Sequence, residues 1–274
     1  MRKVLVSATL LAVAMLVGCA NSSGKKSEQP EQSDAAAADG WRTLPLVRDG
    51  TIHPAWDHVG FGGFVVESDG SLRTENDERG LGLLVYTKEK FGDCQFRVVY
   101  RSNDPGSNAG VFVRIDDGIL KRLDEQPPAA TRNANGTLTD AGVKAMQEAS
   151  EKELGPWYAV HHGYEVQIAD AGDEFHRTGA VYSFNRAEKA PERPRDQWRT
   201  MLITLRGNVV EVAIDGQRVS TFDSAAADLP PRKQWHEPRR EHRRPQKGYV
   251  GLQNHDPGDV VFFKEVSVRP LGSK

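Results

Sequence analysis

Short runs of alternating apolar and polar residues, separated by turn residues, constrain the fold of this 274-residue chain more than any other feature. Residues 209–214 and 217–222, for example, alternate with the period of a β-strand and are joined by Asp215-Gly216, a pair that favours a tight hairpin turn. Strand-like runs do not alternate with helical segments, as they would in a parallel sheet. The pattern therefore predicts an all-β fold, a two-sheet antiparallel β-sandwich with long loop insertions and one inserted helix. The expected strands are 63–67, 71–74, 83–86, 96–101, 111–115, 164–170, 198–205, 209–214, 217–222, 250–255 and 260–268.

Three long insertions separate these strands, at 117–162, 185–197 and 224–247. Within the first, residues 139–154 lack proline, are rich in helix-forming residues and begin with Thr139-Asp140 as a cap, so they predict the inserted helix. Long loops of a sandwich gather at the rim of one sheet, where we expect them to form the walls of a cleft.

The N-terminus indicates export. Two basic residues precede an apolar run, residues 4–17, that is too short to span a bilayer, and the run ends in Leu16-Val17-Gly18-Cys19. This resembles a bacterial lipoprotein signal, which implies removal of residues 1–18 and lipidation of Cys19. Residues 19–39 then form a flexible tether and residues 40–274 a single domain, lipid-anchored to a membrane of the bacterial cell envelope. An ordinary secretory signal or an N-terminal membrane anchor is the alternative.

Charge and cysteine content exclude some partners. The formal net charge is −2, so the chain lacks the positive charge that nucleic-acid binding needs. The basic run 232–247 is interleaved with acidic residues and prolines, and we expect it to be a solvated loop. Cys94, the only cysteine besides Cys19, alternates with apolar residues and is expected to be a buried thiol without a disulfide.

Several of the predicted strands carry polar residues that could do chemistry. The period of two places Glu165 and Gln167 on one face of their strand and pairs Gln253 with His255 on another. In the strand 111–115 it separates Arg114 from the apolar face. If these strands are neighbours, an arginine, a glutamate, two glutamines and a histidine converge on one surface.

Four motifs together resemble a known family. They are residues 108–114 (NAGVFVR), 163–170 (GYEVQIAD), 178–182 (TGAVY) and 251–255 (GLQNH), supported by the strand that begins at Trp198. They look like the 3-keto-disaccharide hydrolase family, and the resemblance runs from about residue 41 to 271. It implies a concanavalin-like jelly roll that acts on carbohydrate. Two departures are Ala109, where the family commonly has serine, and the long insertion 117–162.

The activity that the resemblance implies explains why such residues are present. A ketone at C3 of a sugar acidifies the hydrogen on C2, so a base can remove it and expel the C1 oxygen, after which water adds to the unsaturated sugar. This route needs a base, an acid and a group that stabilises an oxyanion. The candidates are Glu165 and His255 as acid and base, in an order that stays open, and Arg114 as the stabiliser. Candidate substrate-binding residues are Gln167, Tyr182 and Gln253, with Asp170 and His176 as second choices. A 3-keto substrate also requires an oxidising partner enzyme.

Other interpretations compete with this one. Arg114 and Glu165 could form a solvated cross-strand ion pair, His255 could be a turn residue, and Tyr182 could bury its ring in the core. The protein could be a lectin-like module that binds glycan without cleaving it, or a conventional glycosidase with Glu165 and Asp170 as its two carboxylates.

The sequence leaves the question of a metal open. His161, His162 and Glu165 lie close together but not at a recognised zinc spacing. Asp173 and Glu174, with Asp170, offer oxygen ligands without a complete calcium loop. A divalent metal therefore remains open and unassigned, and the absence of a phosphate loop or nucleotide motif argues against an organic cofactor.

Overall fold

The structure is a computed structural model that describes residues 39–194, 196–226 and 228–272. The predicted signal peptide, the lipidated cysteine and nearly all of the tether lie outside the described residues. No helix within the described ranges is long and apolar enough to cross a membrane.

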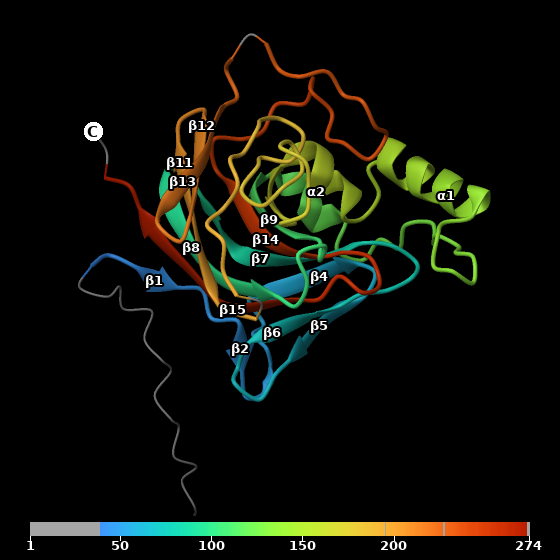
Figure 1. Cartoon of the computed structure of the whole chain (residues 1–274), viewed down its shortest axis with the longest axis horizontal. Coiled ribbons are helices and arrows are strands. Elements are labelled where there is room, and N and C mark those ends of the chain that lie inside the picture. Colours follow the sequence, from blue (N-terminus) through green and yellow to red (C-terminus); the bar gives the residue numbers. More distant parts are fainter. Residues whose placement is uncertain (1–38, 195, 227, 273–274) are drawn as a thin grey trace, which may run out of the picture. The chain divides into compact units, whose positions relative to one another are not determined.

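Two antiparallel sheets form the sandwich, as predicted (Figure 1). The larger has eight strands: β13 (Gln217–Asp223), β12 (Val209–Ile214), β11 (Arg199–Arg206), β8 (Cys94–Ser102), β15 (Val261–Pro270), β6 (Leu72–Glu75) and β5 (Gly63–Val66) in spatial order, with β1 (Arg42–Thr43) pairing with β15. The smaller has five: β10 (Tyr164–Ile168), β9 (Ala109–Ile115), β14 (Gly248–Asn254), β7 (Gly82–Phe91) and β4 (Trp56–Gly60). A separate hairpin joins β2 (Val47–Arg48) to β3 (Thr51–Ile52).

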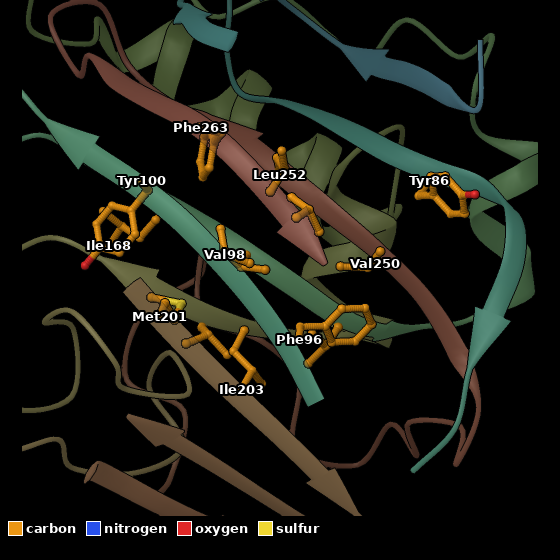
Figure 2. Packing of buried hydrophobic residues seen from close by; sticks show 14 of the residues in the cluster. Tyr86, Phe96, Val98, Tyr100, Ile168, Met201, Ile203, Val250, Leu252 and Phe263 are labelled. Atoms are coloured by element: carbon orange, nitrogen blue, oxygen red, sulfur yellow. The ribbon is translucent and has the colours of Figure 1, made fainter. Parts of the chain in front are cut away.

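The core lies between the two sheets. Figure 2 shows Phe96, Val98 and Met201 of the larger sheet packed against Val250 and Leu252 of the smaller one. Each of these side chains lies on the inward face of its strand. Because successive side chains of a strand point to opposite faces, the alternation of apolar and polar residues identifies them in the sequence. The predicted meander of β11, β12 and β13 is confirmed, with turns at Gly207 and Asp215-Gly216.

Cys94 is buried in this core, as expected. Burial raises the pKa of its thiol to about 12, with Arg114 as a smaller opposing influence. At neutral pH the thiol is therefore protonated and unreactive.

The first insertion covers the outer face of the five-stranded sheet. The predicted helix is α1 (Asp140–Glu151), and the Thr139 side chain caps it by accepting a hydrogen bond from Gly142 N. The insertion also contains a 3₁₀ turn, η1 (Asp117–Lys121), and a second helix, α2 (Trp157–His162), so the expectation of one inserted helix is incomplete.

A second hydrophobic cluster packs these helices against the sheet. Phe112, Leu83 and Val85 project from the outer face and pack with Trp157 and Ala149 of the insertion. The cluster covers only part of this face. The part that remains carries the polar residues described next.

Candidate active site

Polar residues lie in register on the outer face of the five-stranded sheet. Glu165 and Gln167 of β10 stand opposite Phe112 and Gly110 of β9. On the other side of β9, Phe112 pairs with Gly251 of β14, and alternation places Gln253 on the same face as Gly251. The structure therefore brings Glu165, Gln167 and Gln253 together, as the sequence predicted.

The absence of a side chain at Gly110 makes room for the carboxyl group of Glu165. A Cβ atom at Gly110 would lie 2.5 Å from Glu165 Oε1 and 2.7 Å from its Cγ. No real side chain tolerates such a contact without displacement. The carboxyl group consequently lies flat against strand β9.

A short segment outside the named strands extends the site beyond β10. Val181 forms a bridge with Val166, and Tyr182 N donates to Glu165 O at 2.8 Å, so Tyr182 is the cross-strand neighbour of Glu165. The Tyr182 hydroxyl lies 3.0 Å from Nδ1 of His236, in the last insertion. Burial, followed by the charge of Glu165, raises the pKa of Tyr182, so its hydroxyl stays protonated.

Glu165 is the most perturbed acid of the site. Burial raises its pKa from the ordinary 4.5 to about 8, against the opposing influences of the positive charge of His255 and a hydrogen bond from Gln253. At neutral pH this carboxyl group is mostly protonated.

A chain of hydrogen bonds orients His255. Gln167 Nε2 donates to Asn108 Oδ1 at 2.9 Å, and Asn108 Nδ2 lies 3.3 Å from His255 Nε2. On the other side of the ring, His255 Nδ1 lies 3.1 Å from Asp259 Oδ2. With the proton on Nδ1 facing Asp259, the Nε2 lone pair accepts from Asn108 and points into the site.

The charges around His255 favour its protonated form. Burial lowers the pKa of the imidazole, but the hydrogen bond to Asp259 and the charges of Asp256, Asp259 and Glu165 outweigh it, so the pKa lies above the ordinary 6.5. Because the charge of each group shifts the pKa of the other, Glu165 and His255 titrate as a coupled pair.

The loops supply site residues that sequence reasoning missed. Asn108 directly precedes β9, Asp259 lies in the segment after β14, and His236 belongs to the basic run 232–247. That run is not the solvated loop expected from its charges, because Glu237 is buried and Arg240 donates to the backbone and hydroxyl oxygens of Ser183. His176, a predicted site residue, packs its ring 5.0 Å from Tyr182 and bonds to Asp173 through Nδ1 at 2.9 Å.

Arg114 does not join the site, and the expected convergence is wrong for this residue. Its backbone is left-handed, with φ of 53°, and the β9–β14 register shifts beside it. The alternation therefore inverts, and Ile115 instead of Arg114 shares the outer face with Phe112. The buried Arg114 guanidinium donates to Gln246 Oε1 at 3.0 Å and to Asp93 Oδ1 at 3.3 Å.

Asp170 also lies apart from Glu165. Its carboxylate accepts from the Thr178 hydroxyl at 2.5 Å and pairs with Arg199 of the larger sheet at 3.2 Å. Asp170 therefore belongs to a contact between the two sheets at the far end of β10, and it does not face Glu165.

The site does not gather the metal ligands that the sequence suggested. Asp173 bonds to His176 and Glu174 pairs with Arg186, so neither turns toward Asp170. His161 is buried with Nε2 near Ser150, away from Glu165. Among the described residues, one group of three potential ligands does converge, and it lies outside this site.

The chain matches one protein family over most of its length. The family model described as "3-keto-alpha-glucoside-1,2-lyase-like domain" matches residues 31–269. This chain belongs to that family. The predicted family membership is confirmed, and it supports carbohydrate as the ligand of this domain.

Solved structures share the fold of this lyase-like domain at low sequence identity. A protein from Parabacteroides distasonis, provisionally described as a glycosyl hydrolase, has a TM-score of 0.53 and 19% identity over 84% of this chain and 99% of its own. A second from the same organism, described in the same way, has a TM-score of 0.54 and 16% identity over 86% and 95%. No curated protein matches the chain.

The departures from the family pattern have different consequences in the lyase-like domain. Ala109 is fully buried in the sandwich core, so a hydroxyl at this position would not reach the site. The insertion 117–162 instead packs on Phe112, the cross-strand partner of Glu165, and contributes Arg132, which pairs with Asp256 next to His255.

The raised pKa of Glu165 predicts a pH-dependent cost in stability. The folded-state pKa of Glu165, about 8, exceeds the ordinary 4.5. The contribution of its protonated carboxyl group to the free energy of unfolding is therefore fully present below pH 4.5 and is lost as the pH rises through about 8. Glu165→Gln cannot ionise, so its melting temperature should rise relative to wild type between pH 4.5 and 9. Thermal melts across this range test it, with the exposed Glu188→Gln as the matched control. A difference independent of pH would contradict the raised pKa.

Proposed function

We propose that this protein cleaves the glycosidic bond of 3-keto-glycosides or 3-keto-disaccharides by elimination across C1 and C2, followed by hydration. Its family membership supports the substrate class. The observation that carries the proposal is the pairing of Glu165, held protonated by burial, with His255, whose Nδ1 faces Asp259 and whose Nε2 lone pair points to Asn108 in the site.

This pairing supports one order of the two roles that the sequence left open. His255 is the base, because Asp259 holds its Nδ1 proton and stabilises the imidazolium formed when Nε2 accepts a proton. Glu165 is the acid, because a carboxyl group with a pKa of about 8 still carries its proton at neutral pH.

The elimination then proceeds as follows. His255 Nε2 takes the proton from C2, and the electron pair forms the enediolate with the C3 carbonyl. Collapse of the enediolate forms the C1=C2 double bond and breaks the C1–O bond, while Glu165 donates its proton to the departing oxygen. Water then adds to C1 as the Glu165 carboxylate accepts its proton and His255 returns a proton to C2, so the net reaction is hydrolysis.

Neutral donors replace Arg114 as the groups that hold the substrate. The Tyr182 hydroxyl stays protonated beside Glu165, and Gln253 is buried on the same face. The amide oxygens of Gln167 and Gln253 are buried without a hydrogen-bond donor from the described protein, and sugar hydroxyls can supply one. The Tyr182 hydroxyl can donate the hydrogen bond that a developing enolate requires, whereas the two amide oxygens accept from sugar hydroxyls and orient the substrate.

A lectin-like binding module is supported less well. Such modules use exposed aromatic rings as platforms for sugars, but Trp157 is buried and packs its ring 5.6 Å from that of the half-buried Trp235. Among the described residues, Leu120 is the one large hydrophobic side chain that is exposed.

A conventional glycosidase is also disfavoured. Its two carboxylates would have to face each other across the glycosidic bond, about 5 to 10 Å apart. Asp170 instead holds Thr178 and Arg199, and Asp259 is occupied in orienting His255.

The keto substrate distinguishes the mechanisms. We expect turnover of 3-keto-trehalose, 3-keto-sucrose or 3-keto-glucosides but not of the unoxidised parents, because only a C3 ketone acidifies the C2 hydrogen. Glu165→Gln and His255→Ala should each lower kcat/KM by about 10²- to 10⁴-fold, whereas Asp170→Asn should leave it within a few-fold. Chromatography of the released sugars measures this. If the unoxidised parents are cleaved and Asp170→Asn abolishes this cleavage, the result would favour the conventional glycosidase. Saturable binding without turnover would favour the lectin-like module.

The pH profile tests the order of acid and base. Activity should rise with pH as His255 loses its proton, at a pKa above 6.5, and fall as Glu165 loses its proton near pH 8. Asp259→Asn removes the partner that raises the pKa of His255, so the acidic limb of kcat/KM should move to lower pH. A shift of only the alkaline limb would reverse the two roles.

We also propose that the enzyme works in the cell envelope, anchored through a lipid on Cys19. The basis is the apolar run followed by Leu16-Val17-Gly18-Cys19. Mass spectrometry of protein isolated from bacterial membranes should find Cys19 as a lipidated first residue. An N-terminus at Met1, or cleavage without lipid, would overturn the anchor.

A further inference from the structure

A second cluster of ionisable groups lies outside the candidate active site. Glu153 follows α1, His162 ends α2, and His242 belongs to the last insertion, 224–247. Each offers one ligand atom, and the three atoms lie within 4.8 Å of one another. All three side chains are half-buried. Residues far apart in the sequence therefore converge on one small volume.

The two histidines present the same nitrogen to the same carboxylate. His162 Nε2 lies 2.8 Å from Glu153 Oε2, and His242 Nε2 lies 2.8 Å from Glu153 Oε1. Their rings stack with centroids 4.3 Å apart and planes inclined by 26°. When each Nε2 carries a proton it donates to the carboxylate. When the protons are absent, the same three atoms form a set of two nitrogens and one oxygen.

We propose that Glu153, His162 and His242 bind a divalent transition-metal cation, with zinc as the preferred ion. Two imidazoles and one carboxylate are a ligand set that zinc accepts, at about 2.0–2.2 Å from each atom and with the remaining position open to water. Calcium and magnesium require mainly oxygen ligands, so this set discriminates against them.

The surrounding residues can hold these ligands in place. Arg239 Nη1 donates to Glu153 Oε1 at 2.6 Å, and Nη2 of the same guanidinium donates to the backbone oxygen of Glu151 at 2.8 Å. Glu153 can therefore ligate through Oε2 while Arg239 retains Oε1. Tyr158 stacks on the ring of His162 at 4.2 Å, and its hydroxyl donates to Asp116 at 2.6 Å. Outer partners of this kind orient metal ligands in proteins.

The cation would join two insertions that lie far apart in the sequence. Glu153 and His162 belong to the insertion 117–162, whereas His242 lies six residues after His236 in the last insertion. His236 bonds to Tyr182 in the candidate active site. The metal would thus fix the loop that completes that site, without contacting Glu165 or His255. Its binding does not depend on the proposed reaction.

Titration calorimetry with zinc chloride on the purified, chelator-treated full chain tests the site. We expect one zinc ion per chain with a dissociation constant in the micromolar range or below, and no comparable binding of calcium or magnesium. Bound cobalt(II) should show the visible absorption typical of tetrahedral coordination. His242→Ala and Glu153→Gln should each weaken zinc binding by at least about tenfold and abolish that absorption.

Two control variants locate the cation. His53→Ala removes a histidine between β3 and β4, and His255→Ala removes the one in the candidate active site; both should bind zinc as wild type does. Circular dichroism verifies that each variant is folded. If His242→Ala does not fold, Glu153→Gln still tests the site, because glutamine preserves the shape of the glutamate side chain. Absence of stoichiometric zinc binding by wild type would show a hydrogen-bonded ion cluster around Arg239 and overturn the proposal. Binding that survives His242→Ala but is lost in His255→Ala would also overturn it, by placing the ion elsewhere.

Discussion

The contact between the carboxyl group of Glu165 and the bare backbone of Gly110 is the constraint on which the site depends. A Cβ atom at Gly110 would collide with Glu165 Oε1, so the carboxyl group can lie against the sheet only because this position is glycine. Burial at this half-buried position raises its pKa to about 8. Geometry in one strand thus sets the protonation state of a residue in the next.

The sheet and the insertions contribute different parts of the site. Paired strands fix Glu165, Gln167 and Gln253 in rows, because register and alternation leave each side chain one direction. The insertions add His236 and cover the adjoining part of the outer face with α1 and α2. A rigid sheet can therefore hold the acid and base while the loops define which glycoside reaches them.

Alternation predicted most of the strands, because apolar residues that face the core recur at every second position. The helix α1 was predicted separately, from its cap at Thr139. Alternation failed at Arg114, because a left-handed residue inside a strand inverts the faces and leaves no sign in the apolar pattern. It also missed Asp259 and His236, which lie in segments without periodicity. Their positions depend on tertiary contacts, which a local pattern does not encode.

The protonation states distinguish a catalytic surface from one that only binds. Burying a carboxyl group until its pKa nears 8 costs stability in every buffer where the unfolded chain would ionise, and a site that merely holds sugar hydroxyls gains nothing from it. A protonated carboxyl group is useful when a proton must be delivered to a departing oxygen. Next to it, the imidazole of His255 presents a lone pair whose proton uptake Asp259 stabilises. Between the pKa of His255 and that of Glu165, about 8, the two groups hold their protons in the states that an elimination consumes, and addition of water restores both states.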